Sequence, residues 1–356
     1  MADEEQEVLE PRRNSYFSGH DDAVAAILRT WSSSRVPHAW LITGPRGIGK
    51  ATLAYRFARL ALSGQGGSAS GLFGATAPSL EVEPVSPVFR QIAAGAHPDL
   101  MVIERGYDDK RDRLRTEIVV DDIRRAVDFM HLKSAMGGWR VVIVDCADDM
   151  NRNSANALLK ILEEPPQRTL LLLVSHAPGG LLPTIRSRCR RLELAPLPYA
   201  IVNELIHHYE PGLDAAEVRQ LTEIAGGSIG RALSVAGAGG LEIHAELSRQ
   251  LSALPNLPMG EIHAFAEKVG KPGGESPFEM ASELLLIWLG RVVRQRATGA
   301  GRPPSAAAAA RGSLEQWLAL WEKTDSLFRR TDAINLDRKQ VWIGAMVDIA
   351  QLTAAR

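Results

Sequence analysis

The sequence has few cysteines for its length, with only Cys146 and Cys189 in 356 residues. Two cysteines so far apart cannot build the disulfide framework of a small secreted domain, nor a Cys-x-x-Cys metal module. Both are therefore expected to be small, buried, hydrophobic side chains.

Long hydrophobic runs are also missing. No apolar run approaches the roughly 18 residues that a membrane-spanning helix needs. The N-terminal stretch MADEEQEVLEPRRN is acidic and polar, unlike a signal peptide. The sequence therefore predicts a cytosolic (cytoplasmic) protein.

An excess of charge of either sign is absent, because 41 basic residues are balanced by 42 acidic ones, for a net charge of −1. The protein as a whole therefore lacks the net positive charge that is typical of nucleic-acid-binding proteins, so any contact with DNA has to be local or indirect. At 356 residues and 45% hydrophobic, the chain is long and apolar enough for two or three globular domains.

The stretch from Val141 to Cys189 carries the strongest structural signal. It contains two apolar, strand-like runs, VVIVD and TLLLLVS, which end in Asp145 and Ser175. Such continuous runs are typical of central strands in a parallel α/β sheet, whose carboxyl ends face the ligand crevice. Asp145 and Ser175 are therefore expected to face one site. Between the runs, NRNSANALLKILEEPP has helical periodicity, and Asn153, Ser154 and Asn156 are candidates for capping it.

A glycine-rich turn upstream indicates what that site binds or once bound. The strand-like HAWLIT is followed by Gly44, Pro45, Arg46, Gly47, Ile48, Gly49 and Lys50, and then by Ala51, Thr52 and a helical stretch. In this strand–turn–helix arrangement, backbone N–H groups cradle phosphates and the lysine reaches the terminal ones. The sequence predicts a site of nucleotide-binding ancestry.

Two substitutions predict that hydrolysis at this site is poor. Ala51 stands where a Ser or Thr hydroxyl would ligate Mg²⁺, and Thr52 is turned by about 100° around the helix. Cys146 stands where a glutamate would polarise water, and a thiol is a poor general base. Whether ATP or ADP binds at all stays open.

Taken together, these motifs resemble the clamp-loader branch of the AAA+ proteins. The resemblance rests on HAWLITGPRGIGK, VVIVDCADDMNRNSANALLKILEEPP, LLLLVSHAP, the Ser187-Arg188-Cys189 triplet, GGSIGRAL and NLDRK, and it extends over nearly the whole chain. It implies an α/β AAA+ module with a RecA-like parallel sheet, a small helical lid and an all-α collar. The expected domains are residues 1–195 (nucleotide-binding-like), 196–240 (lid) and 241–356 (oligomerisation collar).

The resemblance also implies roles for single residues. Arg188 would be an arginine finger that reaches the triphosphate of a neighbouring subunit, whereas Arg186, Arg190 and Arg191 fit a solvated basic patch better. Arg231 matches the second-sensor position near the phosphates. Asn156 and Lys160 would help to arrange a subunit boundary.

Partners and cofactors follow from the same resemblance. The partners would be gamma/tau and delta clamp-loader subunits, the sliding clamp and primer–template DNA, with no membrane. Many relatives carry a four-cysteine zinc module, but here the interval 64–87 is a Gly/Ser/Ala insertion, so no zinc is expected. Polymerase chemistry would belong to other subunits of the polymerase complex, and ATPase activity would be weak or absent.

Two alternatives remain at this point. The chain could be a gamma/tau-like active ATPase, which would turn over ATP in isolation, although Ala51 and Cys146 argue against it. It could also be an AAA+ module that works in DNA repair, which would fail to capture clamp-loader subunits.

Overall fold

The computed structural model describes residues 10–33, 35–64, 79–108, 113–237, 239–271, 277–299, 311–333 and 335–354. They form two compact units, Met1–Arg231 and Ala232–Arg356. The boundaries predicted at 195 and 240 stay predictions. Most of the insertion 64–87 and the poly-alanine stretch after Pro304 lie outside the described residues.

A five-stranded parallel sheet forms the centre of the first unit. Its strands are β2 (Leu100–Ile103), β5 (Arg140–Val144), β6 (Thr169–Ser175), β1 (Ala39–Thr43) and β7 (Arg190–Glu193), in this spatial order. β1 pairs Thr43 with Ser175 of β6 and with Glu193 of β7. A short antiparallel pair, β3 (Tyr107–Asp108) and β4 (Arg113–Leu114), lies outside it. The α/β fold predicted from the apolar runs is confirmed.

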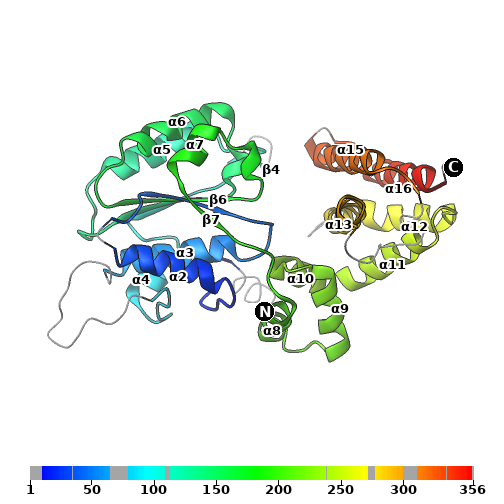
Figure 1. Ribbon diagram of the computed structural model, residues 1–356, viewed down its shortest axis with the longest axis horizontal. Coiled ribbons are helices and arrows are strands. Elements are labelled where there is room, and N and C mark those ends of the chain that lie inside the picture. The colour runs from blue at the N-terminus through cyan, green and yellow to red at the C-terminus, as the bar shows by residue number, and fades with distance from the viewer. Residues whose placement is uncertain are drawn as a thin grey trace. The chain divides into compact units, whose positions relative to one another are not determined.

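Helices cover both faces of this sheet, which explains why its three central strands, β5, β6 and β1, are almost wholly apolar and buried throughout. One face is covered by α2 (Asp21–Trp31) and α3 (Lys50–Leu62), with α4 (Pro87–Ala93) beyond them. The other is covered by α5 (Val120–His131), α6 (Arg152–Glu163) and α7 (Pro183–Arg188) (Figure 1). Strand residues alternate between the two cores: Trp40 and Ile42 pack with α3, whereas Leu41 packs with α5 and α6.

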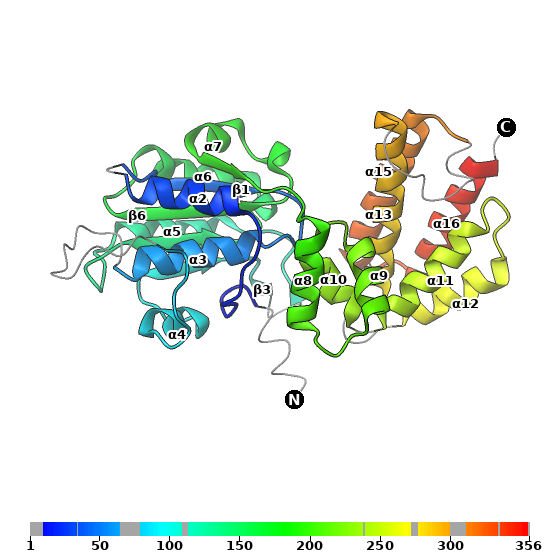
Figure 2. The same ribbon diagram turned by 60° about the horizontal axis from the view of Figure 1, so that its bottom comes forward.

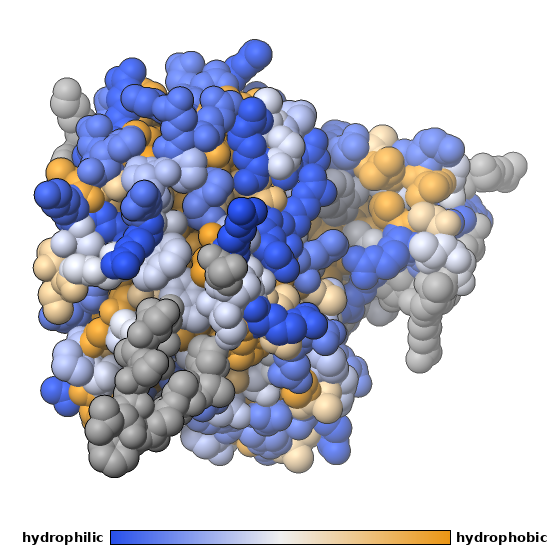
Figure 3. All heavy atoms as spheres, turned by 60° about the vertical axis from the view of Figure 1, so that its left-hand side comes forward, coloured by the Kyte–Doolittle hydropathy of each residue, from blue (hydrophilic) through white to orange (hydrophobic). Residues whose placement is uncertain are grey.

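On the face of the molecule that Figure 3 shows, hydrophilic side chains predominate, and hydrophobic ones appear in small groups, one of them at the right of the view. This is what two-sided coverage of a sheet by amphipathic helices predicts. Among the described residues, no helix has the length and apolarity that crossing a membrane requires.

Helix α6 starts differently from the sequence prediction. The N-cap is Asn151, whose side chain accepts a hydrogen bond from the backbone N–H of Ser154 at 3.0 Å. The fully buried Ser154 hydroxyl donates to the carbonyl of Ile118 at 2.7 Å, which ties α6 to the segment just before α5. Asn153 and Asn156, the other capping candidates, are exposed. The prediction was wrong about the residue because the helix begins one turn earlier.

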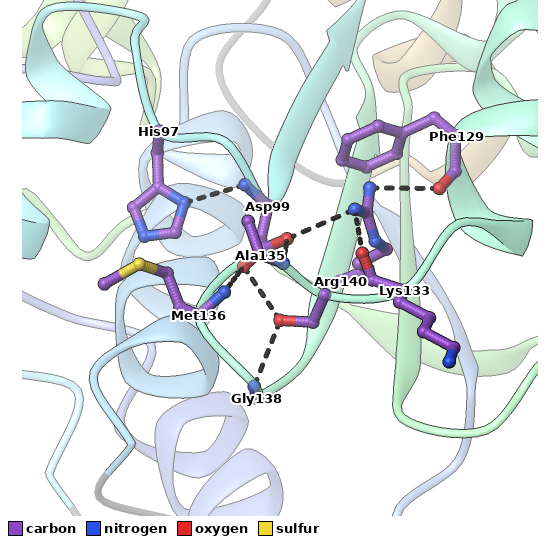
Figure 4. A network of polar contacts seen from close by, with 9 residues as sticks. His97, Asp99, Phe129, Lys133, Ala135, Met136, Gly138 and Arg140 are labelled. Carbon is purple, nitrogen blue, oxygen red and sulfur yellow. Dashed lines mark hydrogen bonds and ion pairs between the residues drawn. The ribbon is translucent and has the colours of Figure 1, made fainter.

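A buried carboxylate that the sequence analysis missed holds the loop between α5 and β5. Asp99 is fully buried, and its oxygens accept hydrogen bonds from Ser134 Oγ (2.8 Å) and from the N–H groups of Ala135 (2.8 Å) and Met136 (2.9 Å). The Arg140 guanidinium lies 3.5 Å away and also contacts the Phe129 ring (Figure 4). Burial alone would raise the pKa of Asp99, but these donors and the cation outweigh it and lower the pKa.

Three helices follow β7. They are α8 (Tyr199–Tyr209), α9 (Ala215–Ala225) and α10 (Ile229–Ala236). Asp214 caps α9 by accepting from the N–H groups of Ala216 and Glu217, while Glu217 accepts in return from the N–H of Asp214. Gly226, at φ 55°, ends the helix. Helices therefore occupy the region predicted to be a lid, and the lid as a separate domain stays a prediction.

The second unit contains only helices among its described residues. They are α11 (Gly240–Ser252), α12 (Met259–Gly270), α13 (Pro277–Thr298), α15 (Leu314–Ala333) and α16 (Arg338–Ala354), and Figure 2 shows them from a second side. Trp317 and Trp342 are fully buried, and Trp342 stacks with Phe328 at 6.3 Å between ring centroids. Trp288 and Trp321 are half-buried. The all-α C-terminal region is confirmed.

Candidate functional site

The glycine-rich turn lies between the carboxyl end of β1 and the start of α3, as predicted. Gly44, Gly47 and Gly49 have φ values of 143°, 71° and 98°. A Cβ on Gly44 would lie 2.4 Å from the carbonyl oxygen of Leu194, so only glycine fits there. Pro45 and Arg46 are exposed, whereas Ile48 is buried in the core beneath the turn.

Lys50 is buried, and its ammonium group donates hydrogen bonds to backbone carbonyls of its own loop. Its Nζ donates to the carbonyl oxygen of Gly44 at 2.7 Å and also to that of Pro45. Burial lowers the pKa of Lys50 to about 8, although the nearby carboxylates of Asp145 and Asp148 favour the charged form. The two carbonyls use two of the three N–H donors of the ammonium, which leaves one for a phosphate.

The metal-binding hydroxyl is missing, as the sequence predicted. Ala51 is half-buried and carries only a methyl group, while Thr52 is buried at 8% exposure on the following helical position. The first turn of α3 therefore offers no hydroxyl at the position after Lys50.

The start of α10 contacts the glycine-rich turn directly. The N–H of Gly230 donates to the carbonyl of Gly47 at 2.8 Å, and a Cβ on Gly230 would lie 2.9 Å from Gly47 Cα. This brings the backbone of Arg231 beside the turn. One nitrogen of the Arg231 guanidinium donates to the carbonyl of Ala225 at 2.6 Å, at the end of α9.

An N-terminal segment, residues 10–20, also lies against the turn and α3. His20 Nε2 lies 2.7 Å from the carbonyl oxygen of Ile48. The buried guanidinium groups of Arg56 and Arg59 donate to the carbonyls of Ser15 (2.7 Å) and Asn14 (2.9 Å). Sequence reasoning missed both arginines, because a cation inside an apolar helical stretch gives no sign of a backbone partner elsewhere in the chain.

Cys146, at the position after Asp145, pairs with a histidine. Its Sγ lies 3.2 Å from His176 Nε2, just beyond β6. Burial raises the pKa of the thiol to about 11 and lowers that of the imidazole to about 4, so both are neutral near pH 7. The thiol and the imidazole are therefore joined by a hydrogen bond between two neutral groups. Cys189 is buried as expected, but Cys146 is only half-buried.

Asp145 and Ser175 stand at the neighbouring ends of β5 and β6, but the side chain that Ser175 contacts is Asp148. Ser175 Oγ donates to Asp148 Oδ1 at 2.7 Å, and Asp148 also accepts from the N–H groups of His176 (2.5 Å) and Ala177 (3.2 Å). Asp148 thus fixes the residues beyond β6 beside Cys146. Burial is the main cause that raises the pKa of Asp145.

Arg188 lies near the amino-terminal ends of the strands, whereas the glycine-rich turn lies at their carboxyl-terminal ends. It ends α7, two residues before β7 begins at Arg190, which pairs with Trp40 of β1. The glycine-rich turn follows the other end of β1, and three strand steps alone span about 10 Å. Arg188 donates from Nη1 to the carbonyl of Thr184 at 3.1 Å, and its Nη2 lies 2.8 Å from Glu163 Oε1.

The other arginines of this turn differ from Arg188. The Arg190 guanidinium lies 5.1 Å from the centre of the Trp40 ring, and Arg191 is exposed. Arg186 is half-buried. Asn156 and Lys160, predicted at a subunit boundary, are exposed on α6, and that role stays a prediction.

The described residues contain no group of three or more His, Cys, Asp or Glu side chains placed to hold a metal ion. Most of the interval 64–87, on which the zinc prediction rests, lies outside them. The absence of zinc therefore stays a prediction.

Comparison with known proteins gives consistent relatives. A family model described as "DNA polymerase III, delta subunit" matches residues 19–198. The delta' subunit of DNA polymerase III from Pseudomonas aeruginosa is 37% identical over 227 residues, which are 61% of this chain and 64% of that protein. The tau/gamma subunit from Haemophilus influenzae is 31% identical over 63% of this chain and 30% of its own length. The chain thus spans less than two thirds of either relative.

A solved structure, the gamma subunit-related protein of DNA polymerase III from Thermotoga maritima, matches with a TM-score of 0.44 and 19% identity, covering 93% of this chain and all of that one. The family model matches half of the chain, including the sheet, the glycine-rich turn and the arginine turn. The chain belongs to the DNA polymerase III delta subunit family.

Proposed function

We propose that this chain takes the delta-prime position in a clamp loader, where it serves as a stator and lends Arg188 to the ATP site of an adjacent gamma/tau subunit. In such an assembly, a ring of subunits uses ATP to open the sliding clamp and close it around primer–template DNA. The delta subunit would be a further partner.

The neutral Cys146–His176 pair carries this proposal. General base catalysis requires a group that accepts a proton from water near neutral pH. A thiol with a pKa of about 11 is protonated at that pH, and the imidazole beside it, with a pKa of about 4, is too weak a base to take a proton from water. With Ala51 unable to ligate Mg²⁺, the site lacks both parts that hydrolysis needs.

The position of Arg188 supports a role in trans. Because it lies at the amino edge of the sheet, on the far side from the glycine-rich turn, it cannot serve the chain's own phosphates. A guanidinium is permanently charged and planar, and it can stabilise the charge that develops on a transferred phosphoryl group. Its exposure at the end of α7 leaves it accessible to a neighbour.

The test is Arg188→Ala in a reconstituted complex in which only the adjacent ATP site is active, the other motor sites carrying inactivated phosphate-loop lysines. We expect turnover at that site to fall by about 10³-fold, the order found for arginine fingers. The matched control is Arg191→Ala, an exposed arginine three residues further on, which should leave turnover unchanged.

Assembly must be measured beside turnover, by size-exclusion chromatography of the reconstituted complex. If the Arg188→Ala complex assembles and hydrolyses ATP at the wild-type rate, the finger role is wrong. If the chain captures no clamp-loader subunit, the alternative of an AAA+ module in DNA repair gains support.

A further inference from the structure

The guanidinium of Arg188 is held by two groups from two different helices. Its Nη2 lies 2.8 Å from Glu163 Oε1, and its Nη1 donates to the Thr184 carbonyl at 3.1 Å. Glu163 is the last residue of α6, and Thr184 lies in the first turn of α7. The arginine is therefore fixed relative to both helices before any partner arrives.

Glu163 is placed for this contact by its own helix. The ends of α6 are defined by the Asn151 cap and by Glu164, whose N–H donates to the carbonyl of Lys160 before the two prolines that follow. A carboxylate is disfavoured at the C-terminus of a helix, where the dipole is negative, so a cation beside it is stabilising. Arg188 supplies that cation and, at the C-terminus of α7, is itself favourably placed.

The donors of the guanidinium are not exhausted by these contacts. An arginine carries five N–H donors in a fixed planar fork. The carbonyl accepts from Nη1 and the carboxylate lies beside Nη2, which leaves N–H donors of the fork for an incoming phosphate. Glu163 can therefore keep its ion pair while Arg188 serves as a finger, so the contact orients the arginine rather than blocks it.

We propose that Glu163 is a positioning residue for Arg188, which fixes the finger's orientation so that less side-chain freedom is lost when it meets the neighbour's triphosphate. The inference rests on the proposed function, since it matters only if Arg188 acts in trans. An arginine side chain loses much rotamer entropy when it is immobilised. Because the contact with Glu163 already restricts the rotamers of Arg188, less entropy remains to be lost when the finger binds the triphosphate.

The expected effect is modest, because both side chains are partly exposed: the side-chain exposures are 37% for Arg188 and 51% for Glu163. In the reconstituted complex, Glu163→Ala should lower kcat at the adjacent site by about two- to five-fold, the range that an exposed ion pair supports. The KM for ATP should not change, because the finger is used in the transition state rather than in substrate binding. Glu163→Asp, which retains the charge, should recover part of the loss.

The matched control is Glu164→Ala, which removes the same charge one residue further on, where it makes no ion pair among the described residues. It should leave kcat unchanged. Circular dichroism melts and size-exclusion profiles of each variant separate misfolding or failed assembly from a loss of orientation.

A double variant distinguishes the failure of this inference from that of the proposed function. If Glu163 acts through Arg188, then adding Glu163→Ala to Arg188→Ala should lower kcat no further. Wild-type turnover in Arg188→Ala would overturn the proposed function. A loss in Arg188→Ala with none in Glu163→Ala, an additive loss in the double variant, or a higher kcat in Glu163→Ala would overturn this inference alone.

Discussion

At the scale of single residues, the candidate site differs from an ATPase in the chemical state of its side chains. The thiol of Cys146 and the imidazole of His176 form a neutral pair, and the ammonium of Lys50 binds the carbonyls of its own loop. The sequence alone shows that Cys146 occupies the position at which an ATPase would carry a glutamate. Its partner cannot be read from the sequence, because His176 follows Asp145 by about thirty residues and meets Cys146 only through the β5–β6 pairing and the Asp148 contacts.

The high pKa of Cys146 makes alkylation a direct measure of this pair. Because only the thiolate reacts, iodoacetamide should modify the native chain at pH 7.5 about 10²-fold more slowly than an ordinary cysteine, with the rate still rising as the pH approaches 11. Mass spectrometry of timed samples would follow the reaction. His176→Ala removes the partner of the thiol, and the buried Cys189 provides an internal reference. Rapid modification of Cys146 at neutral pH would contradict a protonated, hydrogen-bonded thiol.

At the scale of helices and strands, apolar patterning was sufficient to predict the central strands and their helices, since each strand is buried on both faces. Patterning could not reveal the Asp99 network (Figure 4), in which one carboxylate joins the start of β2 to the loop before β5. An aspartate next to a strand resembles any loop aspartate in sequence. Only the meeting of two chain segments about 35 residues apart makes it a buried, charged anchor.

Asp99→Ala should lower the free energy of unfolding by about 3–5 kcal/mol, because it leaves the Arg140 cation buried without its partner. The exposed Asp128→Ala on α5 is the control. Since the folded pKa of Asp99 is lowered, its contribution is complete above the ordinary aspartate pKa and is lost as the pH falls through the folded value. Urea titrations should show a large difference in the free energy of unfolding between the wild-type protein and Asp99→Ala at pH 7, and this difference should shrink at successively lower pH. Equal stability of the two proteins at pH 7 would refute the anchoring role.

At the scale of the whole molecule, the order of elements and the all-α C-terminal region followed from the sequence, but the contacts around the glycine-rich turn did not. These contacts join that turn to residues 10–20 and to the start of α10, which lie far apart along the first unit. The loop motif alone predicts a phosphate cradle. The hydrogen bond between Gly230 and Gly47 depends on how the lid helices return to the sheet.

The isolated chain should therefore bind ATP weakly and hydrolyse little of it, in contrast to a gamma/tau-like motor. Titration with a fluorescent ATP analogue should show any remaining affinity falling by about tenfold per pH unit above pH 8, as Lys50 loses its proton in the unliganded chain. The affinity should be lower still, and without this pH dependence, in Lys50→Met. Brisk turnover by the lone chain would overturn the stator proposal.

The anchoring of the N-terminal segment has one more consequence. The guanidinium groups of Arg56 and Arg59 hold that segment by hydrogen bonds to the neutral backbone carbonyls of Ser15 and Asn14, not by ion pairs with carboxylates. Mobile ions weaken attraction between opposite net charges far more than they weaken a buried bond to a dipole. We therefore expect the N-terminal segment to stay bound to α3 at molar salt concentrations, which screen the ion pairs on the surface of the protein.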